Sequence, residues 1–196
     1  MEDLRAFLCD PGGRGGTIMS WLCTRRCDGG SEDFARRLRR TRTVVLNCAN
    51  IGCVYAANRR RRDGELAGKM QGSYNNFEWE GVRKAMEYYW DRGVTPQGVC
   101  KHRTAQLSPV PLDLRDHVSL CPVVDNQAGI DDLFTIRVAM KYGCQLVDND
   151  NYRDWKAGVH EDVRQWLSSE GAGASLKVTY IFDLNGRFLP SLEPPE

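Results

Sequence analysis

The 196-residue sequence lacks several features that would assign it quickly to a class of function. It has no glycine-rich phosphate loop, no GxGxxG fingerprint and no GxSxG elbow, so neither nucleotide-cofactor nor serine-hydrolase chemistry is indicated. It has no long apolar run, and its first ten residues, MEDLRAFLCD, carry acids among the apolar side chains. We therefore expect no signal peptide, no membrane span and no mitochondrial presequence.

The sequence also lacks a large charge imbalance and a regular pattern of zinc ligands. Its formal net charge is +1, so any nucleic-acid binding must depend on local basic clusters. Eight cysteines are present, but Cys23 and Cys27, and Cys48 and Cys53, lack CxxC spacing, and the three histidines are scattered. We expect reduced, partly buried thiols in the cytosol or nucleus, with structural zinc as the alternative.

The composition that is present, 41% hydrophobic and 27% charged, is typical of a globular protein. We expect an N-terminal basic extension over residues 1–40, one folded domain over 41–190 and a short tail over 191–196. The extension contains the breaker cluster PGGRGG and leads into the basic run FARRLRRTR. That run is either a solvated helix face or a contact for phosphate groups.

Apolar spacing in the domain predicts strands that alternate with helices. Strands are expected over 43–46, 94–102, 117–124 and 144–148, and a hairpin with an Asn-Gly turn over 177–191. Helices are expected over 76–93 and 129–143, and in a stretch that contains Val163, Trp166 and Leu167. Residues 104–117 are expected to be a loop. This order predicts a three-layer α/β/α sandwich with a mainly parallel, Rossmann-like central sheet.

A long polar segment over 53–76 shows no clear period and carries four consecutive arginines, Arg59, Arg60, Arg61 and Arg62. We expect a loop there, either disordered and solvated or functional.

Acidic residues follow the predicted strands, where open parallel sheets form their sites. Asp148, Asp150 and Asp154 come after the strand QLV, and a helix that began near 150 would place the last two on one face. Asp131 and Asp132 open the preceding helix, where capping is the alternative role. Carboxylates that converge repel one another unless a cation lies between them, and Mg²⁺ or Mn²⁺ is the natural occupant.

Four blocks carry a resemblance to a known family: VVLNCAN, FEWEGVRKAMEYYWDRG, IDDLFTIRVAMKYGCQLVDNDNYRDW and YIFDLNGRFLPS. In order and character they resemble the NYN domain of the Regnase-like ribonucleases, within the PIN-like superfamily. The resemblance covers roughly residues 41–190, with patchy similarity over 94–125. Its most specific part is the acidic pair followed, after a helix and a strand, by NDNYRD.

The resemblance implies a metal-dependent endoribonuclease whose acids correspond to Asp131, Asp132, Asp150 and Asp154. It also implies an aspartate at the end of the first strand, the principal metal ligand, where this sequence has Asn47. Asn50 matches an asparagine of the family three residues later. An amide keeps one ligand oxygen but loses the charge, so a divalent ion would bind more weakly.

Two interpretations of Asn47 stay open. The protein is a natural pseudonuclease that still binds RNA, or Asn47 is an inactivating substitution in a chain whose native residue is Asp. On either interpretation this chain is expected to be inactive or impaired.

The resemblance implies cleavage of single-stranded or stem-loop RNA by a water that a metal activates, in RNA decay or silencing. Arg59, Arg60, Arg61, Arg62, Arg153 and Asn50 would then contact RNA, while Arg137 would lie on a solvated helix face. The implied setting is the cytoplasm or RNA granules, with the nucleus also open, no membrane, a homodimer open, and silencing or decay factors as partners. The alternatives are a catalytically silent RNA-binding or scaffold module and, more weakly, a phosphatase-like hydrolase.

Overall fold

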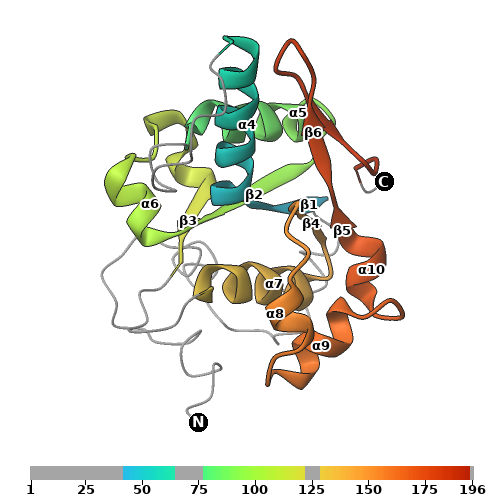
Figure 1. Ribbon diagram of the computed structural model, residues 1–196. Helices are drawn as coiled ribbons and strands as arrows, with labels where there is room; N and C mark the ends of the chain where they lie inside the picture. The colour runs from blue at the N-terminus through green and yellow to red at the C-terminus, as the bar shows by residue number, and fades with distance from the viewer. Residues whose placement is uncertain (1–41, 65–76, 122–128, 195–196) are drawn as a thin grey trace, which may run out of the picture.

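A computed structural model describes residues 42–64, 77–121 and 129–194 of the chain (Figure 1). Five strands form a parallel sheet in the order β3-β2-β1-β4-β5. Their bounds are β1 Thr43–Asn47, β2 Thr95–Cys100, β3 Val118–Leu120, β4 Gln145–Val147 and β5 Lys177–Val178. All four pairings are parallel, which confirms the predicted mainly parallel sheet.

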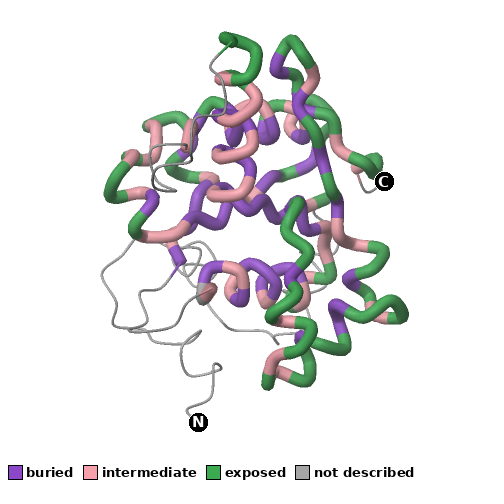
Figure 2. The backbone as a smooth tube through the Cα atoms, in the orientation of Figure 1, coloured by how far each residue is buried: buried purple, intermediate pink, exposed green. Residues whose placement is uncertain are grey.

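The central strand β1 divides the core into two halves. Its side chains alternate between the faces of the sheet, so Val44 and Leu46 belong to one hydrophobic cluster and Val45 to the other. All three are at most 1% exposed, as expected for a strand covered on both faces. The buried interior runs along the sheet between the helical layers in Figure 2. The predicted three-layer α/β/α sandwich is therefore confirmed.

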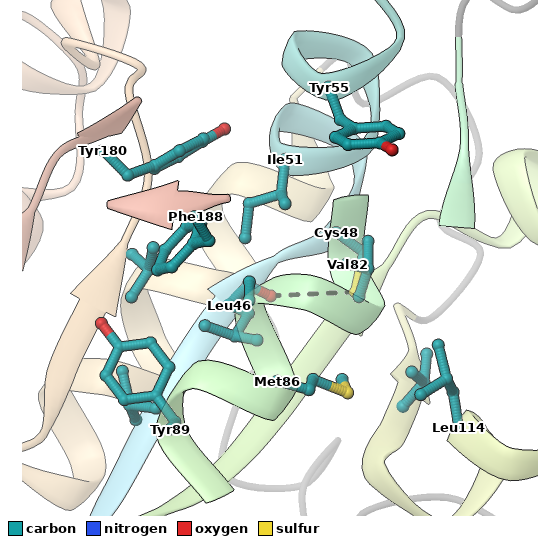
Figure 3. Close-up of a cluster of buried hydrophobic side chains, with 14 of the residues drawn as sticks. Leu46, Cys48, Ile51, Tyr55, Val82, Met86, Tyr89, Leu114, Tyr180 and Phe188 are labelled. Carbon is teal, nitrogen blue, oxygen red and sulfur yellow. Dashed lines mark hydrogen bonds between the residues drawn. The ribbon is translucent and has the colours of Figure 1, made fainter. Parts of the chain in front are cut away.

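The first face is covered by α4 (Cys48–Arg62), α5 (Trp79–Trp90) and a hairpin of β6 (Tyr180–Phe182) and β7 (Phe188–Pro190). Side chains from these elements meet in the close-up of Figure 3. The apolar stripe of α5 is buried as its spacing predicts, with Trp79, Val82, Met86 and Tyr89 all at most 7% exposed. Fully burying such side chains stabilises a fold by roughly 1.5–3 kcal/mol each.

The second face is covered by α7 (Ile130–Tyr142) and α9 (Glu161–Leu167). Leu133 and Ile136 of α7 are buried, together with the predicted Val163, Trp166 and Leu167 of α9. Arg137 is half-buried, and its Nη2 donates to Oδ1 of the exposed Asp162 of α9 at 3.1 Å. The short helices α8 (Arg153–Lys156) and α10 (Ala172–Leu176) complete this side.

The predicted loop over 53–76 is wrong in its first part, because α4 continues to Arg62. Only the first half of α4 packs against the core, through residues such as Ile51 and Tyr55. An apolar stripe along the whole helix is therefore not needed, and the sequence does not contain one. Arginine is a good helix former, and the four arginines in the last turn interact favourably with the negative end of the helix dipole. Residues 65–76 lie outside the described part.

Two further boundaries differ from the prediction. Strand β2 ends at Cys100 rather than at 102, and the expected loop over 104–117 contains α6 (His102–Leu107) and the 3-10 helix η2 (Leu112–His117). Both helices are short, so neither repeats an apolar period often enough to be recognised. Strand β3 ends at Leu120, and the rest of the strand expected there, 122–124, lies outside the described residues.

The Asn-Gly hairpin is confirmed. Strands β6 and β7 pair antiparallel, and Gly186 takes the left-handed conformation of the turn, with φ 75°. Ser191 and Glu193 still bond to the domain, since their backbones pair with Thr179 and the Gln145 side chain.

The cysteines that the structure describes, Cys48, Cys53, Cys100, Cys121 and Cys144, are free and buried or half-buried, as expected for core thiols. Cys23, Cys27 and the basic run of the extension up to residue 41 lie outside the described residues. Within the described ranges, no helix is both long and apolar enough to cross a membrane.

Candidate active site

Polar side chains gather at the carboxyl edge of the sheet. Asn47 ends β1, Lys101 follows β2, and Asp148 follows β4. Because these neighbouring strands run parallel, their carboxyl ends lie at one edge, the place where open α/β sheets form sites. The first turn of α7 brings Asp131 to the same edge, where its Oδ1 lies 2.8 Å from Nζ of Lys101.

Asn47 uses both ends of its carboxamide. Its Oδ1 accepts a hydrogen bond from the Asn50 N–H at 3.2 Å, so Asn47 is the N-cap of α4. Its Nδ2 donates to Oδ2 of Asp148 at 2.5 Å. The side chain is only 6% exposed, so both bonds are made away from water. An amide at this position can donate to Asp148, whereas an ionised carboxylate has no hydrogen to donate.

Asp148 is the centre of the hydrogen-bond network at this edge. It is fully buried, and its carboxylate accepts from Asn47 Nδ2, from the Tyr152 hydroxyl and, at 2.8 Å, from the Asp150 N–H. Burial raises the pKa of Asp148, and the three donated hydrogen bonds oppose that shift. Asp148 was predicted at this edge from its place directly after the apolar run QLV, but it was not among the ligands that the resemblance implies.

Asp150 begins a tight turn that aims it outward. Its Oδ1 accepts from the Tyr152 N–H at 2.8 Å, and Tyr152 adopts the left-handed conformation with φ 53° and ψ 39°. Tyr152 is the one non-glycine residue with positive φ in the described part of the chain. Helix α8 begins only at Arg153, so the expectation that Asp150 and Asp154 share a helix face is wrong. A left-handed residue between them interrupts any right-handed helix.

The charges of four acids interact at this edge. Burial raises the pKa of Asp132 to about 7, and the nearby carboxylates of Asp131, Asp148 and Asp150 add to that shift. Lys101 acts in the opposite direction. Of the acids predicted from the resemblance, Asp131, Asp132 and Asp150 are therefore close enough to influence one another.

Lys177, from β5, lies on the other side of the same network. Its Nζ donates to the carbonyl oxygen of Asp150 and lies 5.2 Å from the centroid of the Tyr152 ring. Burial lowers the pKa of Lys177, and the Asp148 carboxylate opposes that shift. Lys177 and Lys101 were not predicted as site residues, because Lys177 begins a strand and Lys101 follows one, and neither belongs to a recognisable motif.

Some predicted site residues lie apart from this cluster. Asp154 and Arg153 are exposed in the first turn of α8, and Asp154 is not among the acids that shift the pKa of Asp132. Asn50 acts within the fold, since its Oδ1 accepts from the Tyr180 hydroxyl at 2.6 Å and from the Asn149 N–H at 3.1 Å. Its predicted contact with RNA stays a prediction.

The four arginines lie at the far end of α4, not beside the acids. Arg59 comes twelve residues after Asn47, which places it about 18 Å along the helix. Arg59 also pairs with Glu78 at 2.9 Å and with Asp63 at 3.2 Å, and Arg62 donates to the Leu184 carbonyl of the hairpin. The arginines expected to contact RNA therefore lie away from the acids, and their contact with RNA stays a prediction.

The fit of a divalent ion can be judged from the donor set. Among the residues described, no group of three or more His, Cys, Asp or Glu side chains is already arranged to hold a metal. The donors are nevertheless the hard oxygens that Mg²⁺ and Mn²⁺ prefer. A cation would also offset the repulsion between the Asp132 carboxylate and its acidic neighbours. The chemistry of these donors therefore suits such an ion, which would have to replace Lys101 as the partner of Asp131.

A small cavity of about 100 Å³ opens beside Lys101. Its walls are mainly apolar, with a few polar groups between them. It is lined by Ala49, Cys53, Phe77, Lys101, Thr104, Leu107 and Ser108.

Neither a scan against protein-family models nor a search of curated proteins gives a match for this chain. Membership of the NYN family therefore stays a prediction from the sequence blocks, and the function has to be argued from the site.

Proposed function

We propose that residues 41–190 form a Mg²⁺- or Mn²⁺-dependent endoribonuclease domain of NYN/PIN-like type that acts on single-stranded or loop RNA. The supporting observation is the environment of Asp132, whose pKa of about 7 reflects burial beside three other carboxylates at the carboxyl edge of a parallel sheet. Perturbed acids of this kind gather at functional sites, and a divalent cation would offset their repulsion. The NDNYRD block supports RNA as the substrate class.

The acids have distinct roles in this proposal. Asp131, Asp132 and Asp150 would hold the ion, which when bound supplies charge neutralisation at a phosphodiester and activation of water. Asp150 is exposed and is aimed outward by its turn with Tyr152, so it can reach a ligand in solution. Asp154 would support the site from the next turn of chain.

Lysines and the cavity would receive the RNA. Lys101 and Lys177 place two cations against the acids, where they would offset the charge of the phosphate backbone. Lys101 also lines the cavity whose wall includes Phe77, and an aromatic ring beside a cation is a common surface for an unpaired base. The arginines at the end of α4 lie away from these lysines and would contact only a more distant part of the RNA.

A second candidate is favoured by a specific observation. Asn47 and Lys101 both satisfy acids of the site without a metal ion, which is the arrangement expected of a catalytically silent RNA-binding or scaffold module. Such a module would recruit silencing or decay factors in the cytoplasm or RNA granules.

Cleavage and retention of a fluorescent single-stranded RNA in Mg²⁺ or Mn²⁺ test the two candidates. We expect slow cleavage that EDTA stops and that Asp150→Asn abolishes, because the amide keeps the turn but removes a ligand charge. Glu87→Gln, a change of the same kind on the exposed face of α5, is the matched control and leaves cleavage unchanged. Retention of RNA without cleavage at any metal concentration would refute the nuclease and support the binding module.

A further inference from the structure

We infer that Asn47 and Asp148 form a matched amide–carboxylate pair, in which Asp148 carries the charge for two adjoining strand ends and positions Asp150. The inference rests on the proposed function only for the role of Asp150 as a metal ligand. The pairing itself rests on hydrogen bonds between the ends of β1 and β4.

The orientation of the Asn47 amide is fixed by its neighbours. Its oxygen must face the Asn50 N–H, because that donor opens α4 and is capped by no other side chain. The Nδ2 group therefore faces Asp148, and the 2.5 Å contact joins a donor to an acceptor. Because both side chains are at most 6% exposed, replacing either one alone would leave its partner buried without this hydrogen bond.

Asp148 transmits this arrangement to the site. Its Oδ1 accepts the Asp150 N–H at 2.8 Å, and its Oδ2 accepts the Tyr152 hydroxyl. These two bonds hold both ends of the Asp150–Tyr152 turn, in which the exposed Asp150 side chain also accepts the Tyr152 N–H. Asp148 is fully buried, so it is a positioning residue and would not itself contact RNA.

The pairing changes what Asn47→Asp is expected to do. A carboxylate at 47 would face the Asp148 carboxylate across the same short contact, and two like charges with no donor between them repel strongly in a buried site. The single change therefore damages the edge instead of completing a metal site. The network at this edge therefore requires a side chain at position 47 that both accepts and donates a hydrogen bond, as an amide does.

Exchanging the two residues should restore the pair. In the double variant Asn47→Asp/Asp148→Asn, the carboxylate at 47 caps α4 and accepts from the amide at 148, which still offers its oxygen to the Asp150 N–H. The Tyr152 hydroxyl then accepts where it donated before. The net charge of the chain is unchanged.

Thermal unfolding in EDTA of the wild type, both single variants and the double variant tests the pair. We expect each single variant to lower Tm by about 5–10 °C, and the double variant to recover most of that loss. Losses that simply add in the double variant, or an Asn47→Asp protein as stable as the wild type, would overturn the pairing.

Mn²⁺ binding by titration calorimetry tests the positioning role in the same four proteins. We expect Asp148→Asn to weaken binding by about tenfold, as loss of a supporting partner does, and the double variant to return close to the wild type. A double variant that regains stability but not Mn²⁺ affinity would show that Asp148 supports only the fold. Absence of Mn²⁺ binding in all four proteins would refute the proposed function and the positioning role, whereas the pairing is decided by the unfolding data.

Discussion

Nζ of Lys101 lies 2.8 Å from Oδ1 of Asp131, so an ammonium group is held against the acids that we propose as metal ligands. Asp131 is largely buried while the Lys101 side chain is 38% exposed, so the pair is only partly screened by water. A divalent ion must compete with Lys101 for the same oxygen, and the balance between them sets how readily the site takes up metal.

The competition predicts the effect of Lys101→Met. Removing the ammonium leaves the acids uncompensated, so Mn²⁺ should bind about threefold or more tightly, while the metal-free protein becomes less stable. Calorimetric titration and unfolding in EDTA measure both effects. Lys84→Met is the control, because Lys84 pairs with Glu80 at 3.3 Å on α5 and should leave Mn²⁺ affinity unchanged. Weaker binding by Lys101→Met would mean that Lys101 helps to hold Asp131 ready for the ion.

The raised pKa of Asp132 predicts a pH dependence of stability. Folded Asp132 keeps its proton up to about pH 7, while the unfolded chain loses it near its ordinary value of 3.8. The folded state therefore binds more protons in this window, and its contribution to stability falls as pH rises from about 4 to about 7. In EDTA, Asp132→Asn should be more stable than the wild type at pH 8 and closer to it at pH 4.

Urea unfolding at both pH values gives the comparison, with Asp116→Asn, an exposed acid in η2, as the control. If the difference between wild type and Asp132→Asn does not change with pH, Asp132 is not strained by its neighbours. The same shift predicts that Mn²⁺ affinity rises with pH through about 7, since the ion must displace the proton.

Two buried tyrosines should respond differently to loss of the hydroxyl group. The Tyr152 hydroxyl donates to buried Asp148, so Tyr152→Phe should lower the free energy of unfolding by about 1–3 kcal/mol. The Tyr89 hydroxyl is buried with no hydrogen-bond partner among the described residues, so Tyr89→Phe should be neutral or stabilising. Equal effects in urea unfolding would contradict the hydrogen-bond assignment at Asp148.

Arg61 and Arg153 are expected to have different roles, because only Arg153 is close in the chain to the Asp150 turn. Arg61 is exposed at the far end of α4, so Arg61→Ala should weaken RNA binding slightly, reduce its salt dependence by about 0.7 of a counterion, and leave the cleavage rate at saturating RNA unchanged. Arg153 follows the turn of Asp150, so Arg153→Ala should slow cleavage. Fluorescence anisotropy and single-turnover cleavage provide the two measurements. A slower cleavage step in Arg61→Ala would place the RNA across α4.

Elements that bury a complete periodic face were predictable from the sequence. Helix α7 follows its apolar spacing up to Gly143, and the hairpin turns at Asn185 and Gly186, because local chemistry decides both. Helix α4 was not predictable in this way. Its packing depends on close approach to α5, where a side chain at Gly81 would lie 2.4 Å from Cβ of Tyr55, and no pattern within one helix reveals such a fit.

The parallel α/β architecture and the acids after its strands could be predicted from the sequence, since the alternation of strands and helices along the chain and the polar residues at strand ends are local features. The sequence did not determine which groups face one another. Asn47 and Asp148 are 101 residues apart, and only the adjacent positions of β1 and β4 in the sheet bring an amide to a buried carboxylate. Tertiary structure alone decided that Asn47 is a hydrogen-bond donor fitted to its neighbour, because the identity of that neighbour is set by the order of the strands.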